Sequence, residues 1–308
     1  MEARPAAVVP VLVAGLVAFA SSPILVRYAG DAPPASVIAL RTLLGALILA
    51  PAWPRVMQET RGVLDGASWR RLVLGGVFLA AHFAAWIESL AFTSVASTSV
   101  LVSTSPLFLA LVTRFVLRVE VSGATWAAVG LGVAGAAIIG LGDARATGAG
   151  PAPLLGNLLA LSAAAVFSLY LLVGGRVRQH LSWAAFVLPV YTTVAVLLTV
   201  YAAARGVLGD GWTPRVFVLC GLMALGPQIV GHGAFGYALR YVSPVLLGLL
   251  SLFEPIGGSM AAYVLFDERP SEVALIGMVV TLLAVASALL VPRIQARNAS
   301  RKASAGRS

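Results

Sequence analysis

The fold of this chain is decided by two stretches that share one pattern, AFTSVASTSVLVSTSPLFLALV at residues 91–112 and RYVSPVLLGLLSLFEPIGGSMA at residues 240–261. Each is an apolar run with a proline near its middle. An offset of 149 residues places Ser105-Pro106 over Glu254-Pro255. Self-similarity at a fixed offset predicts that the chain consists of two copies of one structural unit.

The composition places both copies in a membrane. Hydrophobic residues make up 59% of the 308 residues and charged residues only 11%, and the mean hydropathy is +0.94. A soluble domain carries roughly 25% charged residues, whereas a helix that spans a bilayer needs about 20 mostly apolar residues. Ten stretches meet this need, near residues 8–26, 36–52, 71–90, 97–116, 121–141, 154–173, 184–204, 215–235, 243–265 and 273–291.

The ten stretches divide into five for each copy. An offset of 148 residues pairs Phe19 with Phe167, so the first copy is expected to cover residues 12–141 and the second 154–291. Because five is odd, the second copy enters the membrane from the opposite side. The predicted fold class is therefore an all-α integral membrane protein with ten transmembrane helices in two inverted five-helix repeats.

The basic residues predict how the helices are oriented. Of the 21 basic residues, Arg41 lies inside an apolar stretch and 15 fall on the side of the N-terminus, which leaves Arg27, Arg145, Arg205, Arg215 and Arg269 on the other side. An excess of Lys and Arg marks cytoplasmic segments. We therefore expect a protein of the cell inner membrane with both termini in the cytoplasm, and a disordered basic tail at residues 292–308.

Several function classes lack their motifs. The three histidines are too scattered for a zinc-binding pair, Cys220 is the only cysteine, and the chain has neither a GxSxG turn nor a GxxxxGK loop. The charge of +9 is spread over short segments and forms no basic face for nucleic acid. We expect no enzyme activity, metal or cofactor. The expected partners are a small-molecule substrate and the lipid bilayer, and a homodimer has no support in the sequence.

Glu254 is the leading candidate for a functional residue. It lies near the middle of the stretch 243–265, where a carboxylate cannot reach water by extending its side chain. We expect Glu254 to contact a substrate amine or to carry a coupling proton, and the alternative is a structural hydrogen-bond acceptor beside Pro255. Arg41 is a possible charge partner but lies nearer the outer face, and His82 is the better match in depth.

Three further side chains belong to the first copy. His82 and Trp86 are one turn apart and share a helix face, so they predict one wall of a cavity. The alternatives are a hydrogen bond between helices for His82 and an interfacial position for Trp86. Arg41 lies about 7.5 Å inside its helix. It is expected to hold a substrate carboxylate, or alternatively to extend its side chain to the outer interface.

The second copy supplies the opposite wall. Gln228 and His232 are four residues apart after Pro227 and share a helix face. Pro106 and Pro255 occupy corresponding mid-helix positions, where proline removes a backbone hydrogen bond. Matched interruptions in two halves indicate a substrate site near the bilayer midplane, and the alternative is a kink needed only for packing.

Two segments resemble the third and fourth helices of the EamA-type domain in the drug/metabolite transporter superfamily. They are HFAAWIESLAFTSVASTSVLVSTSPLFLALVTRFVLRVEVS (82–122) and GPQIVGHGAFGYALRYVSPVLLGLLSLFEPIGGSMAAYVLFDERPS (226–271). The shared pattern is an aromatic-rich helix, a turn, and a helix with a central proline. The resemblance implies a carrier in which helices 1–4 and 6–9 enclose a central cavity, with helices 5 and 10 outside it. Ser105 stands where the second copy has Glu254, so the acidic residue is not symmetric.

We therefore predict a secondary transporter of small metabolites that exports amino acids or related compounds by alternating access around a midplane cavity. The superfamily also includes exporters of dyes and drugs, so efflux of drugs or cationic dyes is the alternative. A channel would need a ring of like charges or a carbonyl filter, and an intramembrane enzyme would need a catalytic motif. The sequence shows neither.

Overall fold

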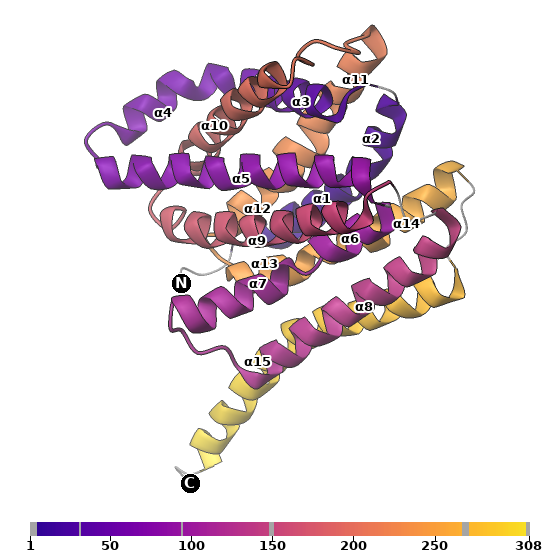
Figure 1. Cartoon of the computed structure of the whole chain (residues 1–308). Helices are drawn as coiled ribbons and strands as arrows, with labels where there is room; N and C mark the ends of the chain where they lie inside the picture. Colours follow the sequence, from indigo (N-terminus) through magenta and orange to yellow (C-terminus); the bar gives the residue numbers. More distant parts are fainter. Residues whose placement is uncertain (1–4, 31, 94, 148–150, 267–270, 306–308) are drawn as a thin grey trace.

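The computed structural model describes residues 5–30, 32–93, 95–147, 151–266 and 271–305. Within these residues every regular element is a helix, and the helices form one bundle (Figure 1). Seven helical spans are long and apolar enough to cross a membrane, and three shorter apolar stretches occupy the remaining predicted positions, Gly123–Ile139, Pro244–Gly257 and Glu272–Ala288. Each of the ten predicted spans therefore has a helical counterpart.

The first half contains the first five spans. Its elements in chain order are α1 (Val8–Ala20), α2 (Ser22–Ala29), α3 (Pro34–Leu49), η1 (Ala50–Ala52), α4 (Trp53–Thr60), α5 (Gly66–Phe92), α6 (Val95–Val102), α7 (Ser105–Leu111), η2 (Val112–Val116) and α8 (Gly123–Thr147). The first span joins α1 to the start of α2, the second runs from α3 to α4, the third is α5, the fourth is α6, α7 and η2, and the fifth is α8.

The second half repeats this plan with five more spans. Its elements are α9 (Pro153–Val177), α10 (Trp183–Ala204), α11 (Pro214–Met223), η3 (Ala224–His232), α12 (Gly233–Ala238), α13 (Pro244–Ser251), α14 (Phe253–Phe266) and α15 (Glu272–Ala305). The sixth span is α9, the seventh is α10, the eighth is α11, η3 and α12, the ninth is α13 and α14, and the tenth is α15.

Contacts between the halves follow a two-fold relation. The second span packs on the seventh, the fourth on the ninth and the fifth on the tenth, while the third packs on the sixth as the first packs on the eighth. Exchanging the two halves maps this set of contacts onto itself. Because each half crosses five times, the axis lies in the membrane plane, and the predicted inverted repeat is confirmed. Helices α8 and α15 run side by side at one edge of the bundle (Figure 1).

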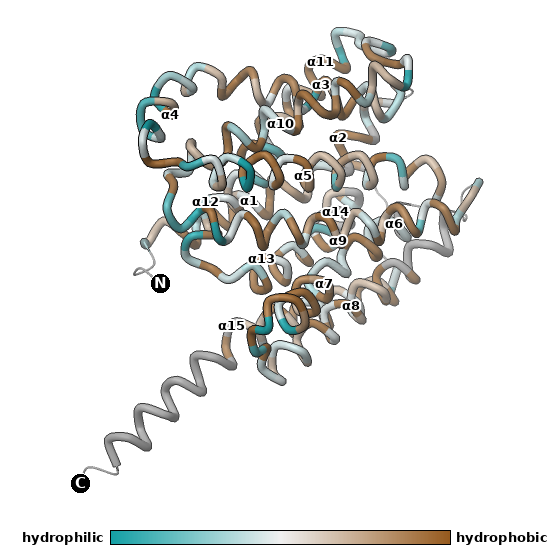
Figure 2. Tube along the Cα trace, turned by 60° about the vertical axis from the view of Figure 1, so that its left-hand side comes forward, coloured by the Kyte–Doolittle hydropathy of each residue, from teal (hydrophilic) through white to brown (hydrophobic). Residues whose placement is uncertain are grey.

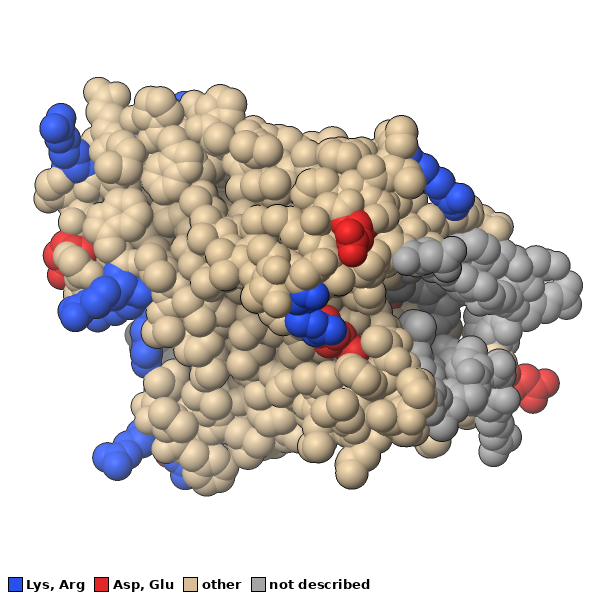
Figure 3. Space-filling model, turned by 45° about the horizontal axis from the view of Figure 1, so that its top comes forward, with Lys and Arg blue, Asp and Glu red and all other residues tan. Residues whose placement is uncertain are grey.

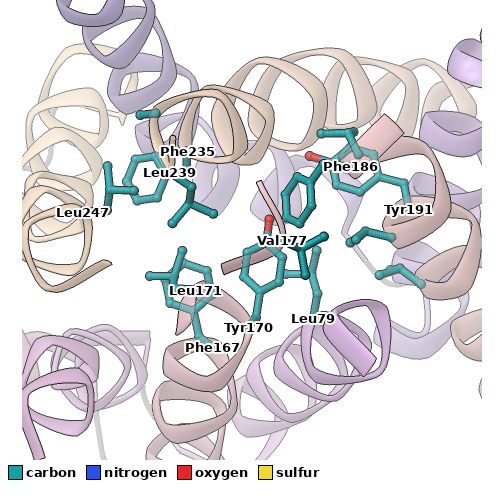
Figure 4. Packing of buried hydrophobic residues seen from close by; sticks show 14 of the residues in the cluster. Leu79, Phe167, Tyr170, Leu171, Val177, Phe186, Tyr191, Phe235, Leu239 and Leu247 are labelled. Atoms are coloured by element: carbon teal, nitrogen blue, oxygen red, sulfur yellow. The ribbon is translucent and has the colours of Figure 1, made fainter. Parts of the chain in front are cut away.

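The outer surface and the core are both apolar, as a lipid environment requires. Large hydrophobic side chains on several spans are strongly exposed, among them Val17, Phe115, Leu154 and Val264. Hydrophilic segments gather at turns such as the one that follows α4 (Figure 2). Inside, one core joins both halves, and Leu79 of the first half packs among Phe167, Tyr170 and Phe186 of the second (Figure 4). A bundle with apolar residues on both sides is stable only in a bilayer.

Basic side chains gather at one end of the bundle. On the face shown in Figure 3, most of the Lys and Arg side chains lie toward one end. Exposed arginines come from the turn after α4, from the start of α5, from the end of the fourth span and from the end of α9: Arg61, Arg70, Arg71, Arg114, Arg118 and Arg176. This is the end predicted to face the cytoplasm.

Helix α15 continues into the segment that was predicted to be a disordered tail, residues 292–308, and ends at Ala305. Residues 306–308 lie outside the described residues, so disorder of the tail stays a prediction. The segment is rich in Ala and Arg, which favour helices, and its first glycine is Gly306.

Candidate functional site

The fourth and ninth spans are interrupted at equivalent points. Helix α6 ends at Val102 and α7 begins at Ser105, while α13 ends at Ser251 and α14 begins at Phe253. Ser105-Pro106 and Glu254-Pro255 therefore both lie in the first turn of a half-helix, where the missing N–H of proline costs little. The Ser105 carbonyl accepts a hydrogen bond of 2.9 Å from Ser168 Oγ on α9.

The eighth span has an unusual geometry. Between α11 and α12, the nine residues Ala224–His232 form a π-helix, in which the backbone N–H of Gly233 donates to the carbonyl of Gln228 five residues earlier. Pro227 lies inside this segment and cannot donate to the preceding turn. A π-helix is rare and frequently marks a functional site.

Arg41 points into the bundle. Its side chain is 1% exposed, and its Cζ atom lies 5.0 Å from the ring centroid of Phe83 on α5. Its Nε atom has no hydrogen-bond partner among the described residues. The alternative that Arg41 extends its side chain to the outer interface is therefore wrong: the aromatic face of Phe83 attracts the guanidinium inward.

Gln228 and His232 lie on the π-helix η3, which packs against α3, the helix that carries Arg41. Gln228 is 0% exposed and His232 is 4% exposed. Both amide atoms of Gln228 and Nδ1 of His232 lack hydrogen-bond partners within the described part of the chain. The Gln228 amide packs against Gly45, one turn after Arg41 on α3, so closely that a Cβ atom at Gly45 would clash with it.

Aromatic rings from three other spans surround His232. Its ring centroid lies 4.6 Å from Phe19 on α1, 4.9 Å from Phe83 on α5 and 5.9 Å from Phe167 on α9, all edge to face. His82 joins this group, 4.8 Å from Phe167 and 6.4 Å from His232, and its Nδ1 lies 3.0 Å from the Ala163 carbonyl. We call Arg41, Gln228, His232, His82 and the rings of Phe19, Phe83 and Phe167 the central cluster.

Glu254 borders the central cluster from the ninth span. It is half-buried and lies in the first turn of α14, where the positive end of the helix dipole favours a carboxylate. Arg41, which points into the bundle, interacts with it electrostatically. Arg41 therefore stays a possible charge partner of Glu254, and a role for His82 in this pairing stays a prediction.

Trp86 packs against the core that also contains Phe83 and Phe167. It is half-buried, and none of the described ring contacts joins it to His82, so its place in a cavity wall stays a prediction. Sequence reasoning also missed the aromatic rings and Gly45. The pairing of Phe19 with Phe167 across the repeat was a signal for two of these rings, because equivalent residues near a two-fold axis meet at the centre.

Polar networks close the bundle at both ends. Glu88 Oε1 accepts a hydrogen bond of 2.7 Å from Tyr201 and forms an ion pair of 3.3 Å with Arg205, and the Glu88 carboxylate raises the pKa of the Arg205 guanidinium. At the opposite end, Arg178 donates to the carbonyls of Gly236 and Leu181. Burial lowers the pKa of Arg178. Both networks join different spans.

The central cluster has the chemistry of a binding site. It presents a buried cation, an amide that can both donate and accept, and a neighbouring carboxylate, and buried polar atoms without partners are costly unless a ligand or water satisfies them. Among the residues that the structure describes, no group of three or more His, Cys, Asp or Glu side chains could hold a metal ion.

Comparison with known proteins gives a family and a fold. The model of the EamA-like transporter family matches residues 7–141 and again residues 154–290. One solved structure, a crystal structure of a protein, is similar with a TM-score of 0.75 and 18% identity, covering 93% of this chain and 99% of that chain. No curated protein matches the chain. Since the family model matches most of the sequence in two consecutive copies, the chain belongs to the EamA-like transporter family and is a transporter of the drug/metabolite transporter type, not an enzyme.

Proposed function

We propose that this protein is a secondary transporter that exports amino acids or related small metabolites through the central cluster. The observation that carries this proposal is the set of partnerless buried polar atoms on Arg41, Gln228 and His232. They lie where the two halves meet. A small polar solute would supply the missing partners.

The charges of the site fit a zwitterion. The Arg41 guanidinium suits a carboxylate, because it offers several donors in one plane. Glu254 suits a substrate ammonium or a coupling proton. The Gln228 amide supplies one donor and one acceptor between them. An α-amino acid carries all of the complementary groups on neighbouring atoms.

The fold supports alternating access. The central cluster draws side chains from both halves, and the fourth and ninth spans are interrupted beside it. Half-helices around a central site let one repeat rock against the other. The ion pair of Glu88 with Arg205 joins the two halves at one end of the bundle, so such a motion would break it.

We also propose that the protein lies in the cell inner membrane with both termini in the cytoplasm. The bias of basic residues toward one end of the bundle supports this orientation. A reporter fused to the C-terminus should be active if its activity requires the cytoplasm. Activity only of a periplasmic reporter would contradict the orientation.

Efflux of cationic dyes is a second candidate, because Phe19, Phe83 and Phe167 together with Glu254 could hold an organic cation. Arg41 disfavours it, since a buried guanidinium repels a second cation. The charge of Arg41 should therefore favour binding of an amino acid and oppose binding of a cationic dye.

Counterflow in proteoliposomes tests the proposal. Vesicles loaded with unlabelled amino acids should transiently accumulate a ¹⁴C-labelled protein hydrolysate, at an initial rate that saturates with its concentration. They should not accumulate tetraphenylphosphonium. Glu254→Gln keeps the shape and one acceptor oxygen but removes the charge, so we expect normal protein levels with lost or pH-independent transport. Counterflow of tetraphenylphosphonium alone would favour dye efflux, and unsaturable flux would indicate a channel.

A further inference from the structure

Tyr191 connects the seventh span to the π-helix. It lies on α10 with 1% of its surface exposed, and its hydroxyl donates a hydrogen bond of 2.7 Å to the backbone carbonyl of Gln228. That carbonyl also accepts from the N–H of Gly233. A side chain of one span thus holds the backbone of another at the residue whose amide enters the central cluster.

The π-helix needs such support. Its geometry is rare and less favourable than that of an α-helix, and Pro227 leaves a gap in the hydrogen bonds of the preceding turn. The register of a helix shifts by about 100° for each residue gained or lost, since a turn contains 3.6 residues. If η3 became α-helical, the residues before it would therefore rotate about the helix axis relative to the residues after it.

The Gln228 side chain depends on that backbone. Its amide makes no hydrogen bond within the described part of the chain, so no polar contact of its own fixes its direction. Only the close approach of Gly45 and the position of the η3 backbone place it against α3, one turn after Arg41. A change in the η3 register would move the Gln228 amide away from this position.

We propose that Tyr191 is a positioning residue for the transport site: its hydrogen bond to the Gln228 carbonyl holds η3 in its π-helical form and so aims the Gln228 amide at the substrate. This inference rests on the proposed function of the central cluster. It assigns to Tyr191 a role in substrate affinity although its side chain does not touch the substrate.

Tyr191→Phe removes the hydroxyl and keeps the packed ring. Tyr170→Phe is the matched control, because Tyr170 is equally buried and, among the described contacts, its hydroxyl makes no hydrogen bond to η3. We expect Tyr191→Phe to raise the half-saturating concentration of ¹⁴C-labelled protein hydrolysate in counterflow about fivefold, as the loss of one buried hydrogen bond predicts, with a smaller change in maximal rate. Tyr170→Phe should leave both values within about twofold.

Two readouts separate positioning from a general structural role. Hydrogen exchange of the full-length protein should become faster in the peptide that covers Gln228 and Gly233 in Tyr191→Phe and not in Tyr170→Phe. In a double-mutant cycle, Tyr191→Phe should add little to Gln228→Ala, because both changes remove the same amide from the site.

The outcomes are distinct. If Gln228→Ala impairs counterflow while Tyr191→Phe behaves as the wild type in counterflow and exchange, the inference is overturned and the proposed function stands. Additive effects of the two changes also overturn it. If the wild type shows no counterflow of the hydrolysate, the proposed function fails together with the role of Tyr191 in affinity, and exchange alone reports whether Tyr191 holds η3.

Discussion

The third and eighth spans occupy equivalent places in the two halves but differ in form. Helix α5 runs unbroken for 27 residues, whereas the eighth span changes from α11 to the π-helix η3 and back to α12. At the offset of 149 residues, Pro227 replaces Phe78. Proline cannot donate a hydrogen bond to the preceding turn, and the eighth span has a π-helix where the third span is a continuous α-helix.

The difference extends to the chemistry of the site. The same offset pairs Leu79 with Gln228 and Phe83 with His232, so two apolar residues of the third span correspond to two polar residues of the eighth. The rings of Phe83 and His232 meet at 4.9 Å, as equivalent residues beside a two-fold axis would. The scaffold is therefore symmetric, while the polar groups that could bind a solute are not.

We expect the largest effect on transport from substitution of Arg41. Its counterpart in the second half, at the offset of 148, is Pro189. Arg41→Ala should reduce counterflow of amino acids by about 100-fold, because charge-assisted hydrogen bonds contribute about 1.5–3 kcal/mol each. Arg41→Lys should restore little, since an ammonium cannot reproduce the planar donors. The exposed Arg215 is the control, and Arg215→Ala should transport normally. Wild-type counterflow in Arg41→Ala would remove Arg41 from the site.

Hydropathy and the repeat predict the scaffold well. The ten spans and the inverted relation follow from apolar runs of the right length and from the offset between Ser105-Pro106 and Glu254-Pro255. These features depend on local composition, which lipid selects directly. The π-helix could not be predicted in the same way. Pro227 signals an interruption, but its π-helical form depends on a hydrogen bond from Tyr191, which lies on another span.

The candidate site was predicted only in part. Arg41, Gln228, His82 and His232 were singled out as polar residues inside apolar stretches, and the structure brings them together. Their directions could not be predicted, because an arginine at a given depth can point inward or outward and only its packing on Phe83 decides. Their roles in transport remain predictions until variants are measured.

Two glycines test the comparison of the two halves, with expected effects of intermediate size. Gly45 on α3 approaches Gln228 of the eighth span, and Gly76 on α5 approaches Thr193 of the seventh so closely that a Cβ atom would clash in either place. The offset of 148 pairs Gly45 with Thr193, so both contacts join equivalent pairs of spans. Only the first contact includes a group of the central cluster.

Gly45→Ala and Gly76→Ala should therefore separate packing from binding. Overpacking costs about 1–3 kcal/mol, so both variants should unfold at lower temperature. Only Gly45→Ala should also raise the half-saturating concentration in counterflow, by about tenfold, because its methyl group displaces the Gln228 amide. Equal changes in affinity for both variants would mean that the close approach at Gly45 serves packing alone.

The smallest expected effect concerns the caps that begin the third and eighth spans. Asp65 Oδ1 accepts a hydrogen bond of 2.8 Å from the N–H of Ser68, and at the offset of 148 Thr213 Oγ1 accepts one of 3.3 Å from the N–H of Val216. Both side chains satisfy a free backbone donor in the first turn. They differ in that only the aspartate can be protonated.

Asp65→Ala and Thr213→Ala should each lower the melting temperature by about 1–2 °C near neutral pH. The hydrogen bonds from Ser68 lower the pKa of Asp65 in the folded protein. A carboxyl group whose folded pKa lies below its unfolded pKa stabilises the fold above the unfolded pKa, and this contribution disappears as the pH falls through the folded pKa. The difference between wild type and Asp65→Ala should therefore vanish in acid, whereas the difference for Thr213→Ala should persist for as long as the protein remains folded. Thermal unfolding of both variants across an acid titration measures this, and parallel pH profiles would show that the Asp65 charge contributes nothing to its cap.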